Sequence, residues 1–265
     1  MGKEVLSYKT PLFTFRLRDL DGGTICKESK DAKSVKIARD VVEFAHFGGV
    51  LESIAVKVSC EATGEEIRWS VEVGGIPSEL ALEYIELPRI CLPKLIDNNE
   101  NGGKILFPYD EGILITDETL LPRYENEFPM SGAYFIFPNK VQSQFISYHF
   151  DSFGLYIGAH DDKRAFKGVD FYPFGDGVCM TMRLYSGASY GEGFKTDYPI
   201  IWRACCGNWQ SAAEIYRAWF EKNLPHTVVK TQENSIAITS NHDITECFFR
   251  LILILPPQKR LISLL

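Results

Sequence analysis

The spacing of apolar residues changes once within residues 145–225, from every second residue to every third or fourth. Residues 154–160 and 178–185 alternate between two faces, which is typical of half-buried strands. After Gly207 the apolar residues follow the period of an α-helix, at Trp209, Ala212, Ala213, Tyr216, Trp219 and Phe220. The sequence therefore predicts several strands followed by one amphipathic helix, and this helix needs a sheet to pack against.

Two residue patterns could start this helix. Asn208 has the short polar side chain of an N-cap, and Ser211 with Glu214 has the spacing of a capping box. Asn223 and Pro225 are expected to end the helix. The sequence leaves the choice between the two starts open.

The segments before residue 145 repeat the period of strands. Alternation is clear in 12–18 and 67–73, and 50–58, 105–116 and 133–137 are also expected to be strands. Residues 24–40 are expected to form a loop or a weak strand. The prolines that flank the RICL segment at 89–92 favour an edge or crossover position for it. Roughly ten or more strands before one helix predict an all-β fold, a large antiparallel β-sandwich with a single C-terminal helix packed on it.

Three places in the sequence are candidates for binding a ligand. The first is the polar break His160-Asp161-Asp162-Lys163, expected at the tip of a hairpin, where His160 and Asp161 could hydrogen-bond sugar hydroxyls. The second is the glycine-rich loop 186–193, where Tyr190 and Glu192 could line a cleft. The third is Trp202, a possible stacking platform. A plain turn, a flexible loop and a core position are the commoner explanations, and the helix positions of Trp209 and Trp219 favour packing on the sheet.

No spacing of carboxylates specifies the pair that a glycosidase needs. The following acidic residues are all interpreted as solvated loop charges: Asp110, Glu111, Asp161, Asp162, Asp170, Asp176 and Glu192. We therefore predict no catalytic residue. His149, His160 and Glu192 remain candidates for the acid and base of a mutarotase, provided that they converge in one concave face.

Composition narrows the possible partners. The formal net charge of −7 gives no basic footprint for nucleic acid. The seven cysteines include no CxxC pair, so no metal site is predicted, and free thiols favour a reducing compartment. There is no phosphate-binding loop or GxSxG motif, and no cofactor is predicted.

The N-terminus lacks the apolar region of a signal peptide, and no apolar run could span a bilayer. This favours a cytoplasmic location, unless an upstream signal has been lost.

Four segments resemble a known family: IELPRI at 85–90, ILFPYDEGILI at 105–115, FGLYIGAHDDKRAFKGVDF at 153–171 and the stretch 198–225. They are similar to the N-terminal region of a bacterial family of glycoside-hydrolase-like proteins, related in architecture to endo-α-N-acetylgalactosaminidases and α-galactosidases. The resemblance implies a β-supersandwich of the galactose-mutarotase-like type, followed by a (β/α)-barrel that carries the catalytic carboxylates. It covers residues 10–225.

The resemblance implies a division into a supersandwich domain at 1–207, a linking helix at 208–225 and a truncated or irregular remnant of a barrel at 226–265. Three hypotheses follow for function. The chain is a non-catalytic sandwich that packs against a missing barrel and shapes a carbohydrate cleft. Alternatively it is a stand-alone carbohydrate-binding or mutarotase-like module, or an inactive structural remnant.

Overall fold

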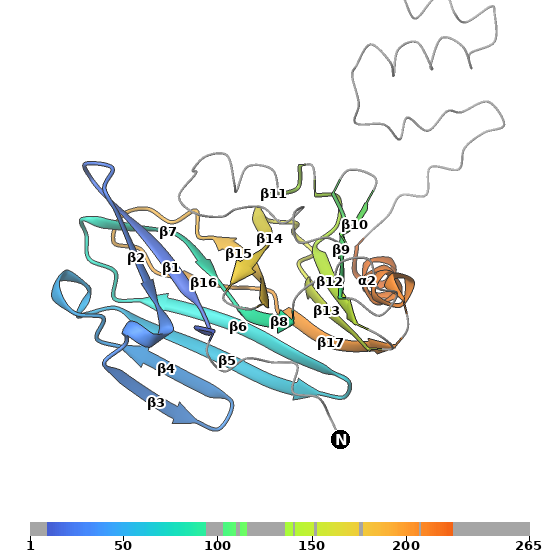
Figure 1. Ribbon diagram of the computed structural model, residues 1–265. Coiled ribbons are helices and arrows are strands. Elements are labelled where there is room, and N and C mark those ends of the chain that lie inside the picture. Colours follow the sequence, from blue (N-terminus) through green and yellow to red (C-terminus); the bar gives the residue numbers. More distant parts are fainter. Residues whose placement is uncertain are drawn as a thin grey trace, which may run out of the picture. The chain divides into compact units, whose positions relative to one another are not determined.

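A computed structural model describes residues 10–93, 103–109, 112–115, 136–139, 141–150, 153–174, 177–206 and 208–224. The chain divides into two compact units, Met1–Asn223 and Leu224–Leu265. The first unit is an all-β sandwich of two antiparallel sheets with one described α-helix (Figure 1). The segment 226–265, expected to be the remnant of a barrel, lies outside the described residues.

The smaller sheet has seven strands. Along its main path the order is β11, β14, β15, β7, β1, β2, and β8 pairs with β15 off this path. Its strands are β1 (Thr14–Asp19), β2 (Thr24–Glu28), β7 (Leu80–Glu86), β8 (Ile90–Pro93), β11 (Ile136–Phe137), β14 (Lys167–Phe174) and β15 (Gly177–Tyr185). Among the described strands β8 pairs with β15 alone, which agrees with the edge or crossover position expected for the RICL segment.

The larger sheet has ten strands, ordered β10, β9, β12, β13, β17, β6, β5, β4, β3, with β16 paired to β6. Its strands are β3 (Ser34–Ala38), β4 (Val41–Ala45), β5 (Ala55–Thr63), β6 (Glu66–Gly74), β9 (Lys104–Phe107), β10 (Ile113–Ile115), β12 (Phe145–Phe150), β13 (Phe153–Ala159), β16 (Phe194–Lys195) and β17 (Ile200–Cys206). Residues 24–40, expected to be a loop or weak strand, contain β2 and β3.

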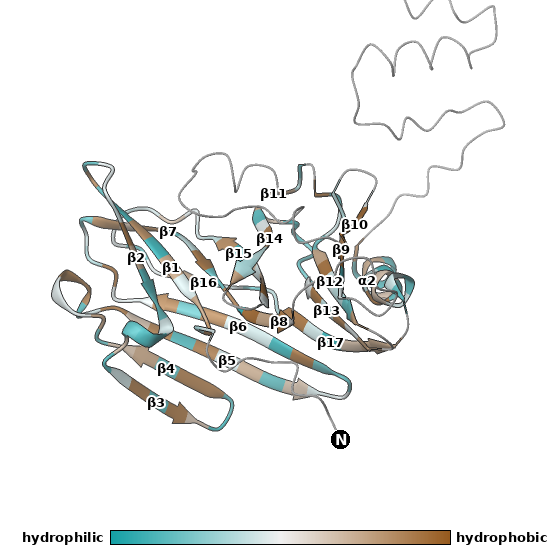
Figure 2. Ribbon diagram, viewed as in Figure 1, coloured by the Kyte–Doolittle hydropathy of each residue, from teal (hydrophilic) through white to brown (hydrophobic). Residues whose placement is uncertain are grey.

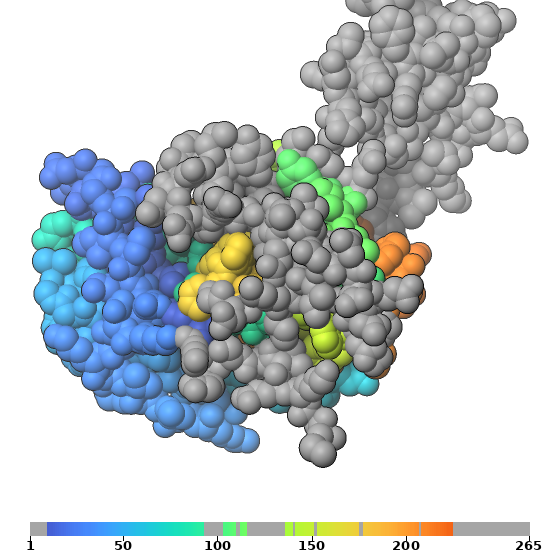
Figure 3. All heavy atoms as spheres, in the orientation of Figure 1, coloured from blue at the N-terminus to red at the C-terminus, as the bar shows by residue number. Residues whose placement is uncertain are grey.

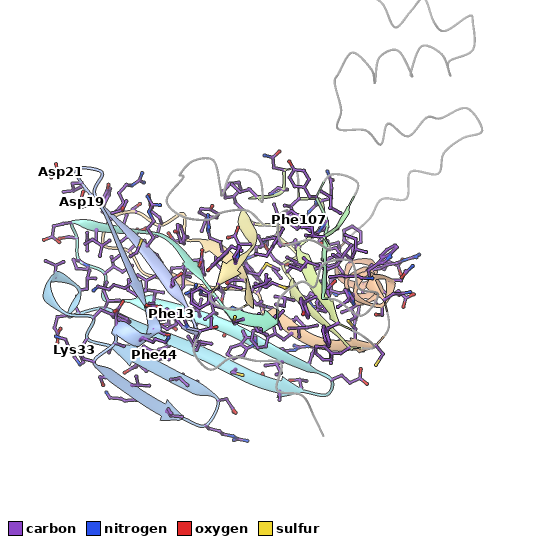
Figure 4. All side chains as sticks on the ribbon, viewed as in Figure 1. Phe13, Asp19, Asp21, Lys33, Phe44 and Phe107 are labelled. Atoms are coloured by element: carbon purple, nitrogen blue, oxygen red, sulfur yellow. The ribbon has the colours of Figure 1, made fainter. Side chains whose placement is uncertain are left out.

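The core lies between the sheets and is built from the alternating apolar residues that the sequence shows. One face of β1 places Phe15 and Leu17 in this core, Phe13 joins them just before the strand, and β15 contributes Met180 and Met182. Phe13 and Phe44 point toward one another across the two sheets, with ring centroids 5.0 Å apart (Figure 4). Figure 2 shows the corresponding alternation of apolar and polar colours along the strands.

Helix α2 (Trp209–Asn223) packs on the outer face of the larger sheet, against β12, β13 and β17. Ala212 and Tyr216 are buried there with Phe145, Tyr156 and Ile201. In Figure 3 its orange surface lies at the opposite side of the sandwich from the blue strands β1–β4. Helix-to-sheet packing, as predicted, therefore buries the apolar stripe.

The start of α2 is decided in favour of Asn208, whose side-chain oxygen accepts a hydrogen bond from Gln210 N at 3.2 Å. Ser211 lies inside the helix, and its hydroxyl donates to the Asn208 carbonyl at 2.8 Å. The expected packing of Trp209 is wrong, because its side chain is 43% exposed. Trp209 is the first residue of the helix, before the stripe reaches the sheet.

The expected hairpin at 160–163 is also wrong. β13 pairs with β12 and β17 in the larger sheet, whereas β14 pairs with β11 and β15 in the smaller one. The connection 160–166 is therefore an arch that carries the chain from one sheet to the other. The sequence identified both strands and the turn, but a polar turn is compatible with either connection.

Candidate functional site

The buried centre of the arch is the carboxylate of Asp161. It accepts hydrogen bonds from Lys163 N at 2.9 Å and Ala165 N at 2.6 Å, and from Lys167 Nζ at 2.8 Å. Asp161 is 1% exposed and Lys167 is fully buried. The interpretation of Asp161 as a solvated loop charge is therefore wrong, since its oxygens close the arch. Sequence reasoning did not single out Lys167, which begins a strand and has the pattern of an ordinary surface residue.

Gln144 connects this ion pair to helix α2. Its side-chain oxygen accepts from Lys167 Nζ at 2.7 Å, and its amide donates to the Asp161 carbonyl at 2.9 Å and, more weakly, to the Tyr216 hydroxyl at 3.5 Å. Lys167 Nζ also lies 4.9 Å from the ring centroid of Tyr198. Burial lowers the pKa of Lys167, and its hydrogen bond to Asp161 opposes that shift. The arch, the sheet and the helix are thus joined by one polar network.

His160 lies beside this network and against the helix. Its ring stacks on Trp219 with centroids 4.8 Å apart and planes at 13°, and its Nε2 is 3.0 Å from the Tyr156 hydroxyl. Burial lowers the pKa of His160 to about 4, with a further contribution from the charge of Arg68. His160 is therefore a neutral packing residue at neutral pH.

We expect this lowered pKa to make the fold sensitive to acid. The unfolded chain binds a proton at His160 near pH 6.5, whereas the folded chain resists it down to about pH 4. The stabilisation is complete above pH 6.5 and is lost as the pH falls from 6.5 to 4. We predict that the difference in unfolding free energy between the wild type and His160→Phe shrinks across this range in urea titrations. Parallel pH curves for the two proteins would contradict the assignment.

Tyr190 and Glu192 lie in the loop before β16, at a different place from His160. The Tyr190 hydroxyl donates to the Asp19 carbonyl at 3.2 Å, and Glu192 Oε2 accepts from Ser189 N at 2.9 Å. Asp19 ends β1 at the β1–β2 turn, which Figures 1 and 4 place at the other side of the sandwich from α2. The structure therefore brings Tyr190 and Glu192 together, but not with His160 or Asp161.

Trp202 lies on the inner face of β17, opposite to the face that α2 covers. Its ring is half-buried and lies 5.0 Å from Trp69 on β6, between centroids. Neither indole N–H has a hydrogen-bond partner among the described residues. The sequence favoured a core position for Trp202, but its contact with Trp69 depends on the β6–β17 register, in which Trp202 is opposite Ile67.

The mutarotase candidates do not converge. His149 is buried on β12, with its Nε2 2.8 Å from the Ser147 hydroxyl, and it faces the side of the sheet that packs on α2. His160 lies at the arch and Glu192 in the distant loop. An acid and a base that act on one sugar must flank it. Their separation counts against a mutarotase centre built from these three residues.

A second cluster, which the sequence did not indicate, lies on the outer face of the smaller sheet. We call Glu86, Arg89, Asp170 and Arg183 the outer charge cluster. All four side chains are under a tenth exposed. Arg183 joins the two carboxylates, with Nη2 3.3 Å from Glu86 Oε1 and Nε 3.0 Å from Asp170 Oδ2. Arg89 Nε lies 3.7 Å from Glu86 Oε2.

Hydroxyl groups complete the outer charge cluster. Thr14 donates to Glu86 Oε2 at 2.9 Å, and Arg89 donates to the Tyr172 hydroxyl at 2.6 Å. Full burial, together with the charge of Glu86, raises the pKa of Asp170 well above its usual range. The interpretation of Asp170 as a solvated loop charge is wrong, because it is a buried strand residue. Asp162 and Glu192 are exposed as expected, and Asp110, Glu111 and Asp176 lie outside the described residues.

No cluster of three or more histidine, cysteine, aspartate or glutamate side chains with the arrangement of a metal site occurs in the described segments. Within the same segments no helix has the length and apolarity to cross a membrane.

Comparison with known proteins bears on the fold. No family model matches the sequence, and no curated protein does. Among solved structures, the α-N-acetylgalactosaminidase NagBb from Bifidobacterium bifidum in its Gal-NHAc-DNJ complex matches with a TM-score of 0.53 at 12% identity. This match covers 82% of the present chain and 34% of the enzyme. The GalNAc complex of the same enzyme gives 0.52 at 13% identity, over 83% and 34% of the two chains.

The chain shares its fold with part of an α-N-acetylgalactosaminidase. It spans about a third of the length of the enzymes that it matches. The predicted architectural relation to such enzymes is confirmed at the level of the fold. A GH36 α-galactosidase from Geobacillus stearothermophilus, AgaA, matches with a TM-score of 0.46 at 12% identity, over 83% of this chain and 33% of that one.

Proposed function

We propose that this chain is the non-catalytic β-sandwich of a carbohydrate-active glycoside hydrolase. In this role it packs against a (β/α)-barrel and helps to shape the cleft in which that barrel holds its substrate. The observation that carries the proposal is the fold match to an α-N-acetylgalactosaminidase, over most of this chain but only a third of the enzyme. The two thirds that the match leaves out provide ample length for a separate catalytic domain.

The geometry of the titratable groups supports a role without chemistry of its own. Asp161 and Lys167 close an arch, His160 is stacked under a helix, and Glu86 and Asp170 are held by arginines. Each group has an evident structural partner. A catalytic pair would instead need two carboxylates, roughly 5–10 Å apart, facing one open cleft.

A second candidate function, stand-alone carbohydrate binding, is favoured by the Trp69–Trp202 pair. Half-buried aromatic rings offer sugars a stacking face. Trp202 is then the proposed contact residue of this pair, whereas Tyr190 with Glu192, and His160, are proposed contact points at two other places on the sandwich. Asp161 contributes by holding the arch in place.

The test is a glycan-array binding screen on the purified full chain, combined with an assay of hydrolysis. We expect galactose- or N-acetylgalactosamine-containing glycans to be retained without being cleaved. Trp202→Ala should abolish binding if the tryptophan pair is the site, whereas Trp209→Ala, at an exposed position on the helix, should leave it unchanged. Binding that survives Trp202→Ala but not Tyr190→Ala would move the site to the loop 186–193. Absence of binding to every glycan would reject the stand-alone function and leave the packing role.

A further inference from the structure

We propose that Cys91 and Cys179, which face each other on neighbouring strands, form a redox-sensitive pair. A small-molecule disulfide such as oxidised glutathione oxidises the two thiols to an intramolecular disulfide bond. The two residues lie directly opposite one another where β8 pairs with β15. Both are free thiols. This inference concerns a covalent modification and is independent of the proposed function.

The strand register gives the pair suitable geometry. Residues directly opposite in an antiparallel pair point to the same face and have Cα atoms about 4.5 or 5.5 Å apart. Disulfides span Cα separations of about 4.4–6.8 Å. Both possible separations therefore fit without movement of the backbone.

The two thiols now have different partners. Cys91 Sγ donates to the Phe174 carbonyl at 3.6 Å, and Cys179 Sγ donates to the Met180 carbonyl at 4.0 Å. Bond formation therefore requires rotation about the Cα–Cβ bonds to other staggered positions. The lack of a side chain at Gly177 helps, because a Cβ there would lie 2.9 Å from Cys91 Sγ.

The difference in burial sets the order of the reaction. Cys91 is half-buried, whereas Cys179 is fully buried, and burial raises the pKa of Cys179 to about 11 against the opposing charge of Arg89. The Cys91 thiolate attacks oxidised glutathione and releases one glutathione thiol. The Cys179 thiolate then attacks Cys91 Sγ and releases the second. Two protein thiols are oxidised, one glutathione disulfide is reduced, and both thiol protons end on the two glutathiones.

The disulfide would fix the strand that follows Arg89, which is a residue of the outer charge cluster. β8 begins at Ile90, one residue after Arg89, and within the described residues it is paired through β15 alone. Cys179 itself lies close enough to Arg89 for their charges to interact. A disulfide would hold the Arg89 segment on the sheet, so the redox state would control how firmly this edge is attached.

The experiment treats the reduced full chain with oxidised glutathione and maps its peptides by mass spectrometry without reduction. We expect one cross-linked pair that contains Cys91 and Cys179, and a rise of the thermal midpoint by roughly 5–10 °C. Cys91→Ser should lose both the cross-link and the rise, whereas Cys206→Ser, at an exposed cysteine, should keep both.

Recovery of Cys91 from the oxidised wild type as a free thiol or a glutathione adduct would overturn the proposal. So would a cross-link between other cysteines in its place. The mapping uses the wild-type protein, so this result does not depend on whether a variant folds. Loss of glycan binding would bear on the proposed function alone, because the cross-link is read directly.

Discussion

Lys167→Met should lower the unfolding free energy by about 3–5 kcal/mol, because it removes one partner of a buried ion pair. The Asp161 carboxylate would keep its two backbone donors, Lys163 N and Ala165 N, but would lose its counter-charge. Because Asp161 is only 1% exposed, water could not replace that charge. Gln144 Oε1 would lose its hydrogen bond from Nζ at the same time. Urea unfolding of both proteins at neutral pH measures the difference.

Two further variants separate this cause from a general effect of charge. Lys163→Met removes a lysine only two residues from Asp161 whose partner, Asp197, is at the surface, and it should change stability little. Asp161→Asn combined with Lys167→Met should recover part of the loss, because no buried charge is left unpaired. An equal loss from Lys163→Met, or no recovery in the double variant, would show that the ion pair does not hold the arch.

Arg183→Met is the second change for which we expect a loss of about 3–5 kcal/mol at neutral pH. Arg183 is the residue that lies against both carboxylates of the outer charge cluster, Glu86 and Asp170. Its guanidinium also lies 4.7 Å from the ring centroid of Tyr84. Its removal leaves two buried acidic groups with Arg89 as their remaining cation in the cluster. Urea unfolding again provides the measurement.

The loss should depend on pH in a defined direction. The folded-state pKa of Asp170 is already raised by burial, so its protonated form is favoured in the fold. Its contribution to stability is complete below the unfolded pKa and is lost as the pH rises through the folded pKa. Removal of Arg183 makes the ionised form costlier still, so the difference between the wild type and Arg183→Met should grow with pH.

Arg203→Met is the matched control, since Arg203 pairs with Glu65, which is 80% exposed. It should have a small effect at every pH. Adding Asp170→Asn to Arg183→Met should restore part of the stability. A pH-independent loss, or one that Asp170→Asn deepens, would contradict our account of the cluster.

The local pattern of this sequence predicts its elements well. The alternation in 178–185 gives the correct inward face of β15, and the stripe from Ala212 to Phe220 gives the helix and its contact with the sheet. Side-chain direction in strands and helices depends on local backbone period, which is visible in the sequence. The all-β sandwich follows from the count of such strands.

The positions of charged residues could not be predicted in the same way. In the sequence, Asp161 lies in a polar turn and Asp170 alternates with apolar residues, as surface residues do. Both are nevertheless buried. Their burial depends on which sheet each strand joins, and the polar segment 160–166 is compatible with a hairpin or an arch. Likewise, Cys91 and Cys179 are far apart in sequence and meet only through the β8–β15 register.

The central claim, a sandwich of glycoside-hydrolase-like fold without chemistry of its own, is tested most directly by measuring turnover. The purified full chain is incubated with nitrophenyl α-N-acetylgalactosaminide and α-galactoside over a range of concentrations. Our account predicts release of nitrophenolate no faster than in buffer. Saturable hydrolysis by the wild type that resists repeated purification would contradict it and would mean that the chain carries a catalytic pair.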